Sequence, residues 1–249
     1  MLNKQQLIED IKMAGIQPGM VILVHSSFKS LGLHNGSPKD VIKAFQEVLT
    51  PEGTLLMPSL SYKTVNKDHP FFSYHDTPSC VGIISETFRK SPNVYRSLNP
   101  IHSICAWGKH AQELTREHHL DSVTLGPHSP FALMLKYKPK IVMLGCGLQP
   151  NTFMHFIENE NNLAYRAIKY QVDFKVINQH NEKLILKGHL PDMSSYIQRY
   201  DRITKVLNNN DLHISKILNA ESYIIDANVL FDKASLILKS QPLFFVDTI

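Results

Sequence analysis

Two short runs of consecutive apolar residues constrain the fold most strongly. Val21–His25 (VILVH) and Lys140–Gly145 (KIVMLG) show no alternation of polar and apolar residues, which is typical of strands buried on both faces. After the first run, Ser37 can cap a helix that has Pro38 in its first turn. Thr54–Pro58 is a second buried strand. The order strand, helix, strand predicts a parallel sheet with a right-handed crossover.

The second half of the chain has a different pattern. From about Gln171, polar and apolar residues alternate, which predicts antiparallel strands. Residues 60–80 have no period and are interpreted as a long loop, whereas Met193–Leu207 is interpreted as a helix. No Pro/Gly/Ser-rich linker divides the 249 residues, so residues 1–249 are predicted to form a single domain. We expect a three-layer α/β/α fold with a central mixed, largely parallel sheet and antiparallel C-terminal strands.

Composition excludes several classes of protein. Lys and Arg number 26 and Asp and Glu number 22, and this net charge of +4 is too small to argue for nucleic acid as a partner. No apolar run approaches the ~20 residues that cross a bilayer, and the N-terminus mixes charged and apolar residues unlike a signal peptide. Cys80, Cys105 and Cys146 form no CxxC pair. We therefore expect a cytoplasmic protein with neither a membrane segment nor a metal site.

Three segments follow the predicted parallel strands, at the edge of the sheet where ligands of α/β proteins bind. They are residues 25–32, 58–62 and 145–155, and we expect them to converge on one crevice. The part SSFKSLG of the first segment (residues 26–32) is named the serine turn; its hydroxyls, backbone N–H groups and Lys29 can hold a phosphate or pyrophosphate. It matches neither a Walker A loop nor GxGxxG, so a polar loop without a ligand is the alternative interpretation.

His155 and Glu158 are three residues apart on the helix predicted from Asn151 to Glu158, so they share one face. A carboxylate beside an imidazole can fix its tautomer and leave the other nitrogen free as a base. A surface His–Glu pair is the alternative, and a metal site lacks a third ligand nearby. GxSxG is absent, which disfavours serine hydrolase chemistry. His118 and His119 lie among charged residues and are interpreted as a solvated helix end.

Six segments in this order resemble the aminoglycoside 3-N-acetyltransferase family. They are VILVHSSFKSLG (21–32), GTLLMPSLSY (53–62), TPSCVGIISETFRKSPNVYRSLNPIHSICAWG (77–108), LDSVTLGPHSPF (120–131), KIVMLGCGLQPNTFMHFIE (140–158) and LAYR (163–166). The resemblance implies an α/β/α fold, acetyl-coenzyme A (acetyl-CoA) as donor, and a small-molecule amine, usually on an amino sugar, as acceptor. It covers nearly the whole chain from Val21.

The resemblance also implies roles for individual residues. The serine turn (Ser26, Ser27, Phe28, Lys29, Ser30, Leu31 and Gly32) matches the segment that holds the coenzyme A pyrophosphate. His155 matches the catalytic histidine and Glu158 the glutamate of the same motif. Ser103 matches a serine near the pantetheine arm and the thioester. Asn99 is also expected to contact the cofactor. It stands before Pro100, where the family usually has a titratable His. This substitution leaves His155 as the expected base.

Acetyl transfer to an amine needs a base and a donor for the oxyanion. We expect His155 to be the base, oriented by Glu158, with a backbone N–H or the hydroxyl of Thr152 or Ser103 as the oxyanion donor. Cationic acceptors favour an acidic pocket, and the candidate contacts are Tyr62, Asp76, Glu86, Asp121 and Asp192. Two alternatives stay open: an N-acyltransferase of amino sugars or nucleotide sugars in polysaccharide synthesis, and a non-catalytic coenzyme A-binding homologue. A homodimer, the commonest soluble oligomer, is compatible with the sequence.

Overall fold

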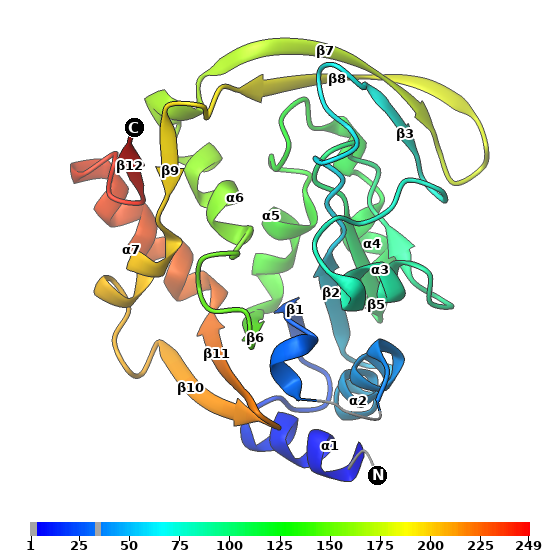
Figure 1. Cartoon of the computed structure of the whole chain (residues 1–249), viewed down its shortest axis with the longest axis vertical. Helices are drawn as coiled ribbons and strands as arrows, with labels where there is room; N and C mark the ends of the chain where they lie inside the picture. Colours follow the sequence, from blue (N-terminus) through cyan, green and yellow to red (C-terminus); the bar gives the residue numbers. More distant parts are fainter. Residues whose placement is uncertain (1–3, 33–35) are drawn as a thin grey trace.

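A computed structural model describes residues 4–32 and 36–249. Its centre is a seven-stranded sheet in the order β10-β11-β6-β1-β2-β5-β4 (Figure 1). The strands of this sheet are β1 (Val21–Ser26), β2 (Thr54–Pro58), β4 (Tyr95–Arg96), β5 (Ile104–Gly108), β6 (Lys140–Leu144), β10 (Leu212–Ile217) and β11 (Ala220–Asp226).

Parallel pairing is confined to the centre of this sheet. Strand β1 pairs in parallel with β2 and with β6, and the other four neighbouring pairs are antiparallel. The predicted mixed sheet is confirmed, but its parallel part is smaller than expected. The reason is that β5 and β11, whose connections the sequence does not reveal, return antiparallel beside β2 and β6.

The side chains of the central strands alternate between two cores. Val21 and Leu23 pack into one core, and Ile22 and Val24 pack into the other. Both cores are covered by helices, which is why these strands are apolar throughout. One face carries α4 (Ala111–Thr115), α5 (Pro130–Met134), α6 (Phe153–Glu160) and α7 (Ala227–Ser240). The other carries α1 (Lys4–Met13), α2 (Pro38–Leu49) and α3 (Ile83–Arg89), which completes the three predicted layers.

Two smaller sheets lie outside the three layers. β3 (Phe71–Ser73), β7 (Ile168–Ile177) and β8 (Lys183–Pro191) form one of them, and the long β7–β8 hairpin crosses the top of the molecule in Figure 1. β9 (Tyr196–Gln198) pairs with β12 (Val246–Thr248). The antiparallel C-terminal strands are therefore confirmed, since β7 pairs antiparallel with β8 and β10 with β11.

Two local predictions were wrong. The expected loop at residues 60–80 contains β3, whose Phe72 packs with Phe174 in a small third core. The expected helix at Met193–Leu207 is instead β9 followed by a 3-10 helix at Tyr200–Lys205. The apolar residues of that segment belong to the same core as those of α6 and α7 although its backbone is irregular, so their spacing imitates a helix. Shorter 3-10 turns occupy Lys29–Leu31, His118–Leu120, Leu135–Tyr137 and Ala164–Arg166.

Within residues 4–32 and 36–249, none of the helices combines the length and the apolar character that crossing a bilayer requires.

Candidate active site

The carboxyl ends of β1 and β6 bring the serine turn against the segment that precedes α6. The backbone N–H of Ser27 donates to the carbonyl of Leu144 at 2.9 Å. Gly145 has a φ of +64°, and a β-carbon there would lie 2.8 Å from the Cβ of Ser30. Glycine at 145 therefore allows both the left-handed turn and the close approach of the two segments. The predicted convergence of residues 26–32 and 145–155 is observed.

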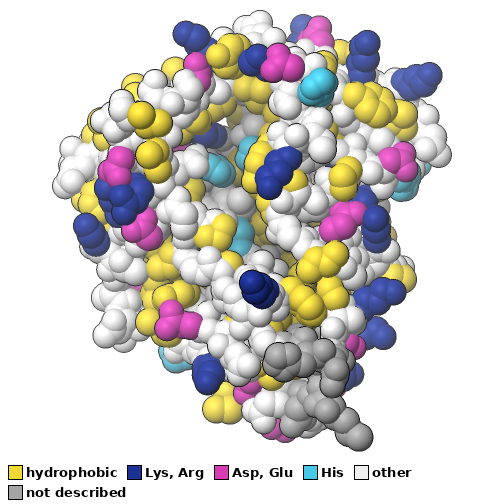
Figure 2. Space-filling view, viewed as in Figure 1, with side chains coloured by type: hydrophobic (Ala, Val, Ile, Leu, Met, Phe, Trp, Pro, Cys, Tyr) yellow, Lys and Arg dark blue, Asp and Glu magenta, His cyan; other side chains and the backbone are white. Residues whose placement is uncertain are grey.

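A cavity of about 560 Å³ opens beside these segments, a volume typical of small-molecule sites. It is visible as the hollow at the centre of the face in Figure 2, with His side chains on its floor. Its polar lining consists of Tyr62, His102, Thr124, Gln149, Asn151, Thr152, His155, Arg166, Gln198 and Tyr200. Its apolar lining consists of Leu60, Val81, Ile101, Pro150, Leu190, Pro191 and Met193.

His155 is held by two groups on its Nδ1 side. The Tyr200 hydroxyl lies 2.7 Å from Nδ1, and Glu158 Oε2 lies 3.3 Å from it. The Tyr200 hydroxyl donates to Glu158 Oε2 at 2.9 Å, so its oxygen is free to accept from Nδ1–H. The proton of a neutral His155 therefore belongs on Nδ1, and Nε2 keeps its lone pair. The imidazole is 15% exposed and lines the cavity, which is where a proton acceptor is needed.

Glu158 is a fully buried carboxylate with several donors. Tyr165 donates to Oε1 at 3.0 Å, Tyr200 donates to Oε2, and the Arg166 Nε lies 3.8 Å from Oε2. Burial alone would raise the pKa of Glu158, but the bond with His155 and the charges of His155 and Arg166 outweigh it and lower that pKa. Glu158 is thus an anion that stabilises a protonated His155.

His25, at the end of β1, fixes the start of α6. Its Nε2 accepts the backbone N–H of Thr152 at 3.0 Å and lies 2.8 Å from the Thr152 hydroxyl. Burial, and then the charge of His155, lowers the pKa of His25 to about 3, so it stays neutral. Since Nε2 carries no proton, the Thr152 hydroxyl at 2.8 Å donates to it as well, and Thr152 also lines the cavity.

His102 is a second imidazole in the cavity. Its ring meets that of His155 edge to face, with the ring centres 5.6 Å apart. Its Nδ1 is buried and has no hydrogen-bond partner among the described residues. Burial, followed by the charges of His155 and Arg166, lowers the pKa of His102 well below its ordinary value. His102 is therefore uncharged beside the base.

Asn99 and Ser103 do not line the cavity. Asn99 Oδ1 accepts the backbone N–H groups of Ile101 and His102, so it shapes the turn that carries His102. The Ser103 hydroxyl is buried, donates to the Ser59 carbonyl at 2.7 Å and accepts from Arg96 Nε at 2.9 Å. Asn99 Oδ1 and the Ser103 hydroxyl are thus used inside the fold, and the contacts of these two residues with coenzyme A stay a prediction. Of the two expected hydroxyl donors, Thr152 is the one that lines the cavity.

The serine turn begins where β1 ends and continues into a 3-10 turn. The Ser30 hydroxyl donates to the Ser27 hydroxyl at 2.8 Å, and Lys29 is exposed without an ion pair among the described residues. Leu31 is buried in the core, so only its backbone can reach a ligand. Gly32 has a φ of +66°, and a β-carbon there would collide with the side chain of Asn219. This turn lies beside the cavity, and its residues are not part of the cavity wall.

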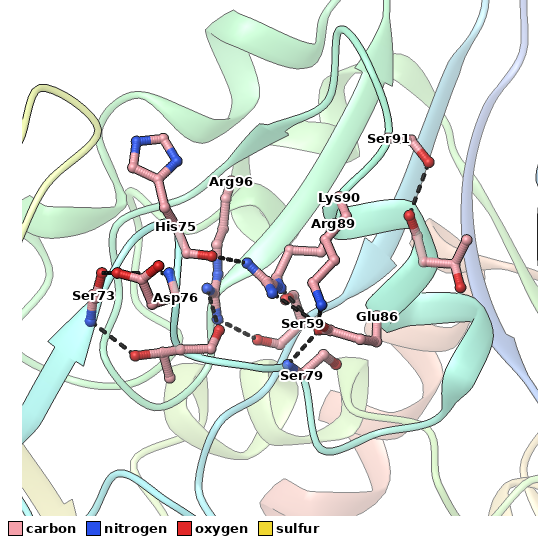
Figure 3. Close-up of polar contacts among 12 residues, drawn as sticks. Ser59, Ser73, His75, Asp76, Ser79, Glu86, Arg89, Lys90, Ser91 and Arg96 are labelled. Atoms are coloured by element: carbon pink, nitrogen blue, oxygen red, sulfur yellow. Dashed lines mark hydrogen bonds and ion pairs between the residues drawn. The ribbon is translucent and has the colours of Figure 1, made fainter.

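The expected acidic pocket is not observed. Asp76 and Glu86, two of its candidate residues, are bonded to neighbouring side chains and backbone groups. Figure 3 shows Glu86 paired with Arg89 and Lys90 and accepting the backbone N–H of Ser79. Burial alone would raise the pKa of Glu86, but these bonds lower it to about 2. Asp76 accepts from the Ser73 hydroxyl at 2.7 Å on the exposed side of the same cluster. Neither carboxylate lines the cavity.

Asp121 and Asp192 are also used locally. Asp121 has a side chain only 1% exposed and accepts from His128 and from the backbone N–H of Gly126. Asp192 accepts the backbone N–H of Ser194 and the Tyr170 hydroxyl. Asp192 lies between two cavity residues in the sequence but is not itself part of the wall. Tyr62 is the one expected acceptor contact that lines the cavity.

His118 was also misinterpreted from the sequence. It is fully buried, with Nδ1 2.7 Å from the Ser97 hydroxyl and Nε2 3.0 Å from the Thr124 carbonyl. Burial lowers its pKa to about 4, so it is a neutral structural residue rather than part of a solvated helix end.

Sequence reasoning missed Tyr200 and Arg166 as site residues. Tyr200 lies in the irregular segment after β9, where Gln149 Oε1 accepts its backbone N–H at 3.0 Å and holds it over α6. Arg166 lies in a 3-10 turn beyond α6. Its guanidinium donates to Asn159 and lies beside the Glu158 carboxylate. The only signal in the sequence was the presence of Arg166 in the LAYR segment. Among the described residues, no group of three or more His, Cys, Asp or Glu is arranged to hold a metal ion.

An imidazole hydrogen-bonded to a buried carboxylate and a tyrosine hydroxyl, in the wall of a cavity, fits an enzyme site for base-assisted group transfer. The model of the aminoglycoside 3-N-acetyltransferase family matches residues 23–239. An aminoglycoside N(3')-acetyltransferase-like protein, YokD of Bacillus subtilis (strain 168), is 34% identical over 206 residues, which are 75% of this chain and 71% of that protein. The chain therefore belongs to the aminoglycoside 3-N-acetyltransferase family and is an N-acetyltransferase with acetyl-CoA as co-substrate.

Solved structures agree with this assignment. A mutant of the aminoglycoside acetyltransferase AAC(3)-IVa in complex with gentamicin superposes with a TM-score of 0.83 and 27% identity, covering 97% of this chain and 90% of that one. A complex of AAC-IIIb with coenzyme A has the same fold, with a TM-score of 0.83, 23% identity and 96% of both chains covered.

Proposed function

We infer that this enzyme transfers the acetyl group of acetyl-CoA to an amine of an aminoglycoside or another amino sugar, with His155 as the general base. The observation that carries this inference is the Tyr200–Glu158–His155 cluster, which places the proton on Nδ1 and leaves Nε2 free at the cavity. The names of the family and of its relatives support the acceptor class.

The reaction requires one proton to move twice. The amine nitrogen attacks the thioester carbonyl while its proton passes to His155 Nε2. The N–C bond forms, the C–S bond breaks, and His155 returns the proton to the sulfur of the leaving coenzyme A. During this cycle His155 is transiently an imidazolium. The buried anion Glu158, fixed by Tyr165 and Tyr200, stabilises that charge without having to reorganise.

The oxyanion of the tetrahedral intermediate needs a donor on the same side of the cavity. We assign this role to the Thr152 hydroxyl, which would turn from His25 Nε2 to the oxyanion, while the Thr152 N–H keeps Nε2 hydrogen-bonded. Loss of one such donor typically costs about 3–4 kcal/mol of barrier. The serine turn is assigned to the coenzyme A pyrophosphate, with backbone N–H groups, the Ser27 and Ser30 hydroxyls, and Lys29 as donors.

Release of free thiol from acetyl-CoA over a panel of amines tests this function, with mass spectrometry of the acceptor on the same samples. We expect thiol release in equal amount to N-acetylated product for at least one amino sugar. Binding of acetyl-CoA with no thiol release for any amine would instead identify a non-catalytic coenzyme A-binding homologue. Thiol release without an acetylated product would identify thioester hydrolysis.

A further inference from the structure

The cavity that reaches His155 has an unusual charge for a site that accepts polycations. Of the 17 described residues that line it, Arg166 alone carries a fixed charge, and none is Asp or Glu. In Figure 2, Lys or Arg side chains lie beside the hollow, and most acidic side chains lie farther out on the same face. The carboxylates expected at an aminoglycoside pocket are bound elsewhere, as described for Glu86 and Asp121.

Arg166 has unused hydrogen-bonding capacity. Its Nε and Nη2 both donate to Asn159 Oδ1, at 3.1 and 3.0 Å. Its Nη1 makes no hydrogen bond to any described residue, although the side chain is only 8% exposed and lines the cavity. A guanidinium has five N–H donors, and its planar shape suits the oxygens of phosphate and carboxylate groups. Arg166 therefore offers N–H donors to a ligand of the cavity.

The charge on Glu158 does not make the cavity acidic. Glu158 is fully buried behind Tyr200 and Tyr165, and it already serves His155 and Arg166. His102, uncharged and close to both His155 and Arg166, adds no negative charge either. A second cationic group of an acceptor would therefore meet Arg166, and an imidazolium at His155 during the reaction, with no carboxylate of the wall to balance it.

We propose that the acceptor of this enzyme is an amino sugar with one amine and one anionic group, a phosphate ester or a carboxylate, and that Arg166 binds this anionic group while the amine faces His155 Nε2. This proposal rests on the acetyl-transfer function proposed above and narrows its substrate class. The two protein groups are close enough for one sugar, because His155 Nδ1 and Arg166 Nε both lie within 4 Å of the same oxygen of Glu158. Arg166 then determines specificity, and the proton still passes to His155.

The test compares four acceptors that differ in charge: glucosamine, glucosamine 6-phosphate, muramic acid and kanamycin. The measured quantity is kcat/KM for thiol release from acetyl-CoA. We expect at least a tenfold preference for glucosamine 6-phosphate or muramic acid over glucosamine, and kanamycin to be the poorest. The phosphate and the carboxylate acceptor together show which anionic group is recognised. A preference for kanamycin, or equal values for glucosamine and both anionic acceptors, overturns the proposal.

Variants of Arg166 separate binding of the acceptor from support of Glu158. Arg166→Gln should bring the ratio of anionic to neutral acceptor close to one, while Arg166→Lys should keep part of it. A purely structural role would lower all values by the same factor and leave the ratio unchanged, which would contradict the proposal. Lys205→Gln, at an exposed cation of the Tyr200–Lys205 turn, is the matched control and should leave the ratio intact. If no amine is acetylated at all, the proposed function itself fails and this inference falls with it.

Discussion

The Tyr200 hydroxyl offers a sharp test of how the base is oriented, because the chain contains its own control. Tyr200 and Tyr165 are both buried, and each donates a hydrogen bond to Glu158, at 2.9 and 3.0 Å. Only Tyr200 also contacts His155, at 2.7 Å from Nδ1. Tyr200→Phe therefore removes a donor to Glu158 and a partner of the base, whereas Tyr165→Phe removes only the donor.

The size of the effect follows from the type of bond. A hydrogen bond to a charged group contributes about 1.5–3 kcal/mol. Both variants should therefore lower the free energy of unfolding by about this amount, because each leaves one lone pair of a buried carboxylate without its donor. If the Tyr200 bond supports the imidazolium in the transition state, the same 1.5–3 kcal/mol corresponds to roughly a ten- to hundredfold loss of kcat.

Urea unfolding and steady-state thiol release measure the two quantities on the same samples. We expect Tyr200→Phe to lose kcat with little change in the KM for acetyl-CoA, and Tyr165→Phe to keep kcat within about threefold. Equal losses of kcat in the two variants would mean that Glu158, and not the orientation of His155, limits the rate. An unchanged kcat in Tyr200→Phe would refute the role assigned to Tyr200.

Three further predictions concern the oxyanion, coenzyme A and pH. Thr152→Val, which keeps the shape, should lower kcat about 10²–10³-fold with an unchanged Kd for acetyl-CoA; an unchanged kcat would remove Thr152 as the donor. Gly145→Ala, whose new β-carbon would lie 2.8 Å from the β-carbons of both Ser30 and Ala220, should displace the serine turn and weaken acetyl-CoA binding measured by calorimetry. Gly147→Ala is the matched control, since its φ of +67° has a similar cost but nothing lies within 4 Å of its β-carbon; equal effects would contradict the serine turn as the pyrophosphate site. Folding holds His25 and His118 neutral, with their pKa values lowered to about 3 and about 4, so the unfolded state takes up protons first as the pH falls below about 6.5. Stability should therefore drop between pH 7 and pH 5, by about 2 kcal/mol for each histidine in urea unfolding, and His118→Gln should lessen the drop; a flat profile would show that these side chains are not buried in neutral form.

Local patterns in the sequence were sufficient to predict the central strands and the pairing of His155 with Glu158. Val21–His25 and Lys140–Gly145 became β1 and β6 because both faces of these strands are covered by helices, which requires an uninterrupted apolar run. His155 and Glu158 were paired correctly because their contact lies within one turn of α6. The serine turn followed from its position after β1.

Contacts between segments far apart in the chain could not be predicted from the sequence. Tyr200 reaches His155 across 45 positions from a segment whose apolar spacing imitates a helix. Ser103 looked available as a hydroxyl, but it is used by Ser59, which follows β2. The candidate acidic residues were chosen for their charge, yet a carboxylate such as Glu86 binds the nearest cations and N–H groups, and no residue pattern reveals which ones. The cavity was expected to be acidic, but its wall contains Arg166 and neither Asp nor Glu.

The assignment of His155 as the proton acceptor is tested most directly by measuring turnover and acetyl-CoA binding for His155→Ala, with His102→Ala in parallel. We expect His155→Ala to lower kcat by about 10²–10⁴-fold while the Kd for acetyl-CoA stays within about twofold. His102→Ala should keep most of the activity, because its ring lies beside the base without taking the proton. Turnover that survives in His155→Ala and disappears in His102→Ala would contradict the assignment.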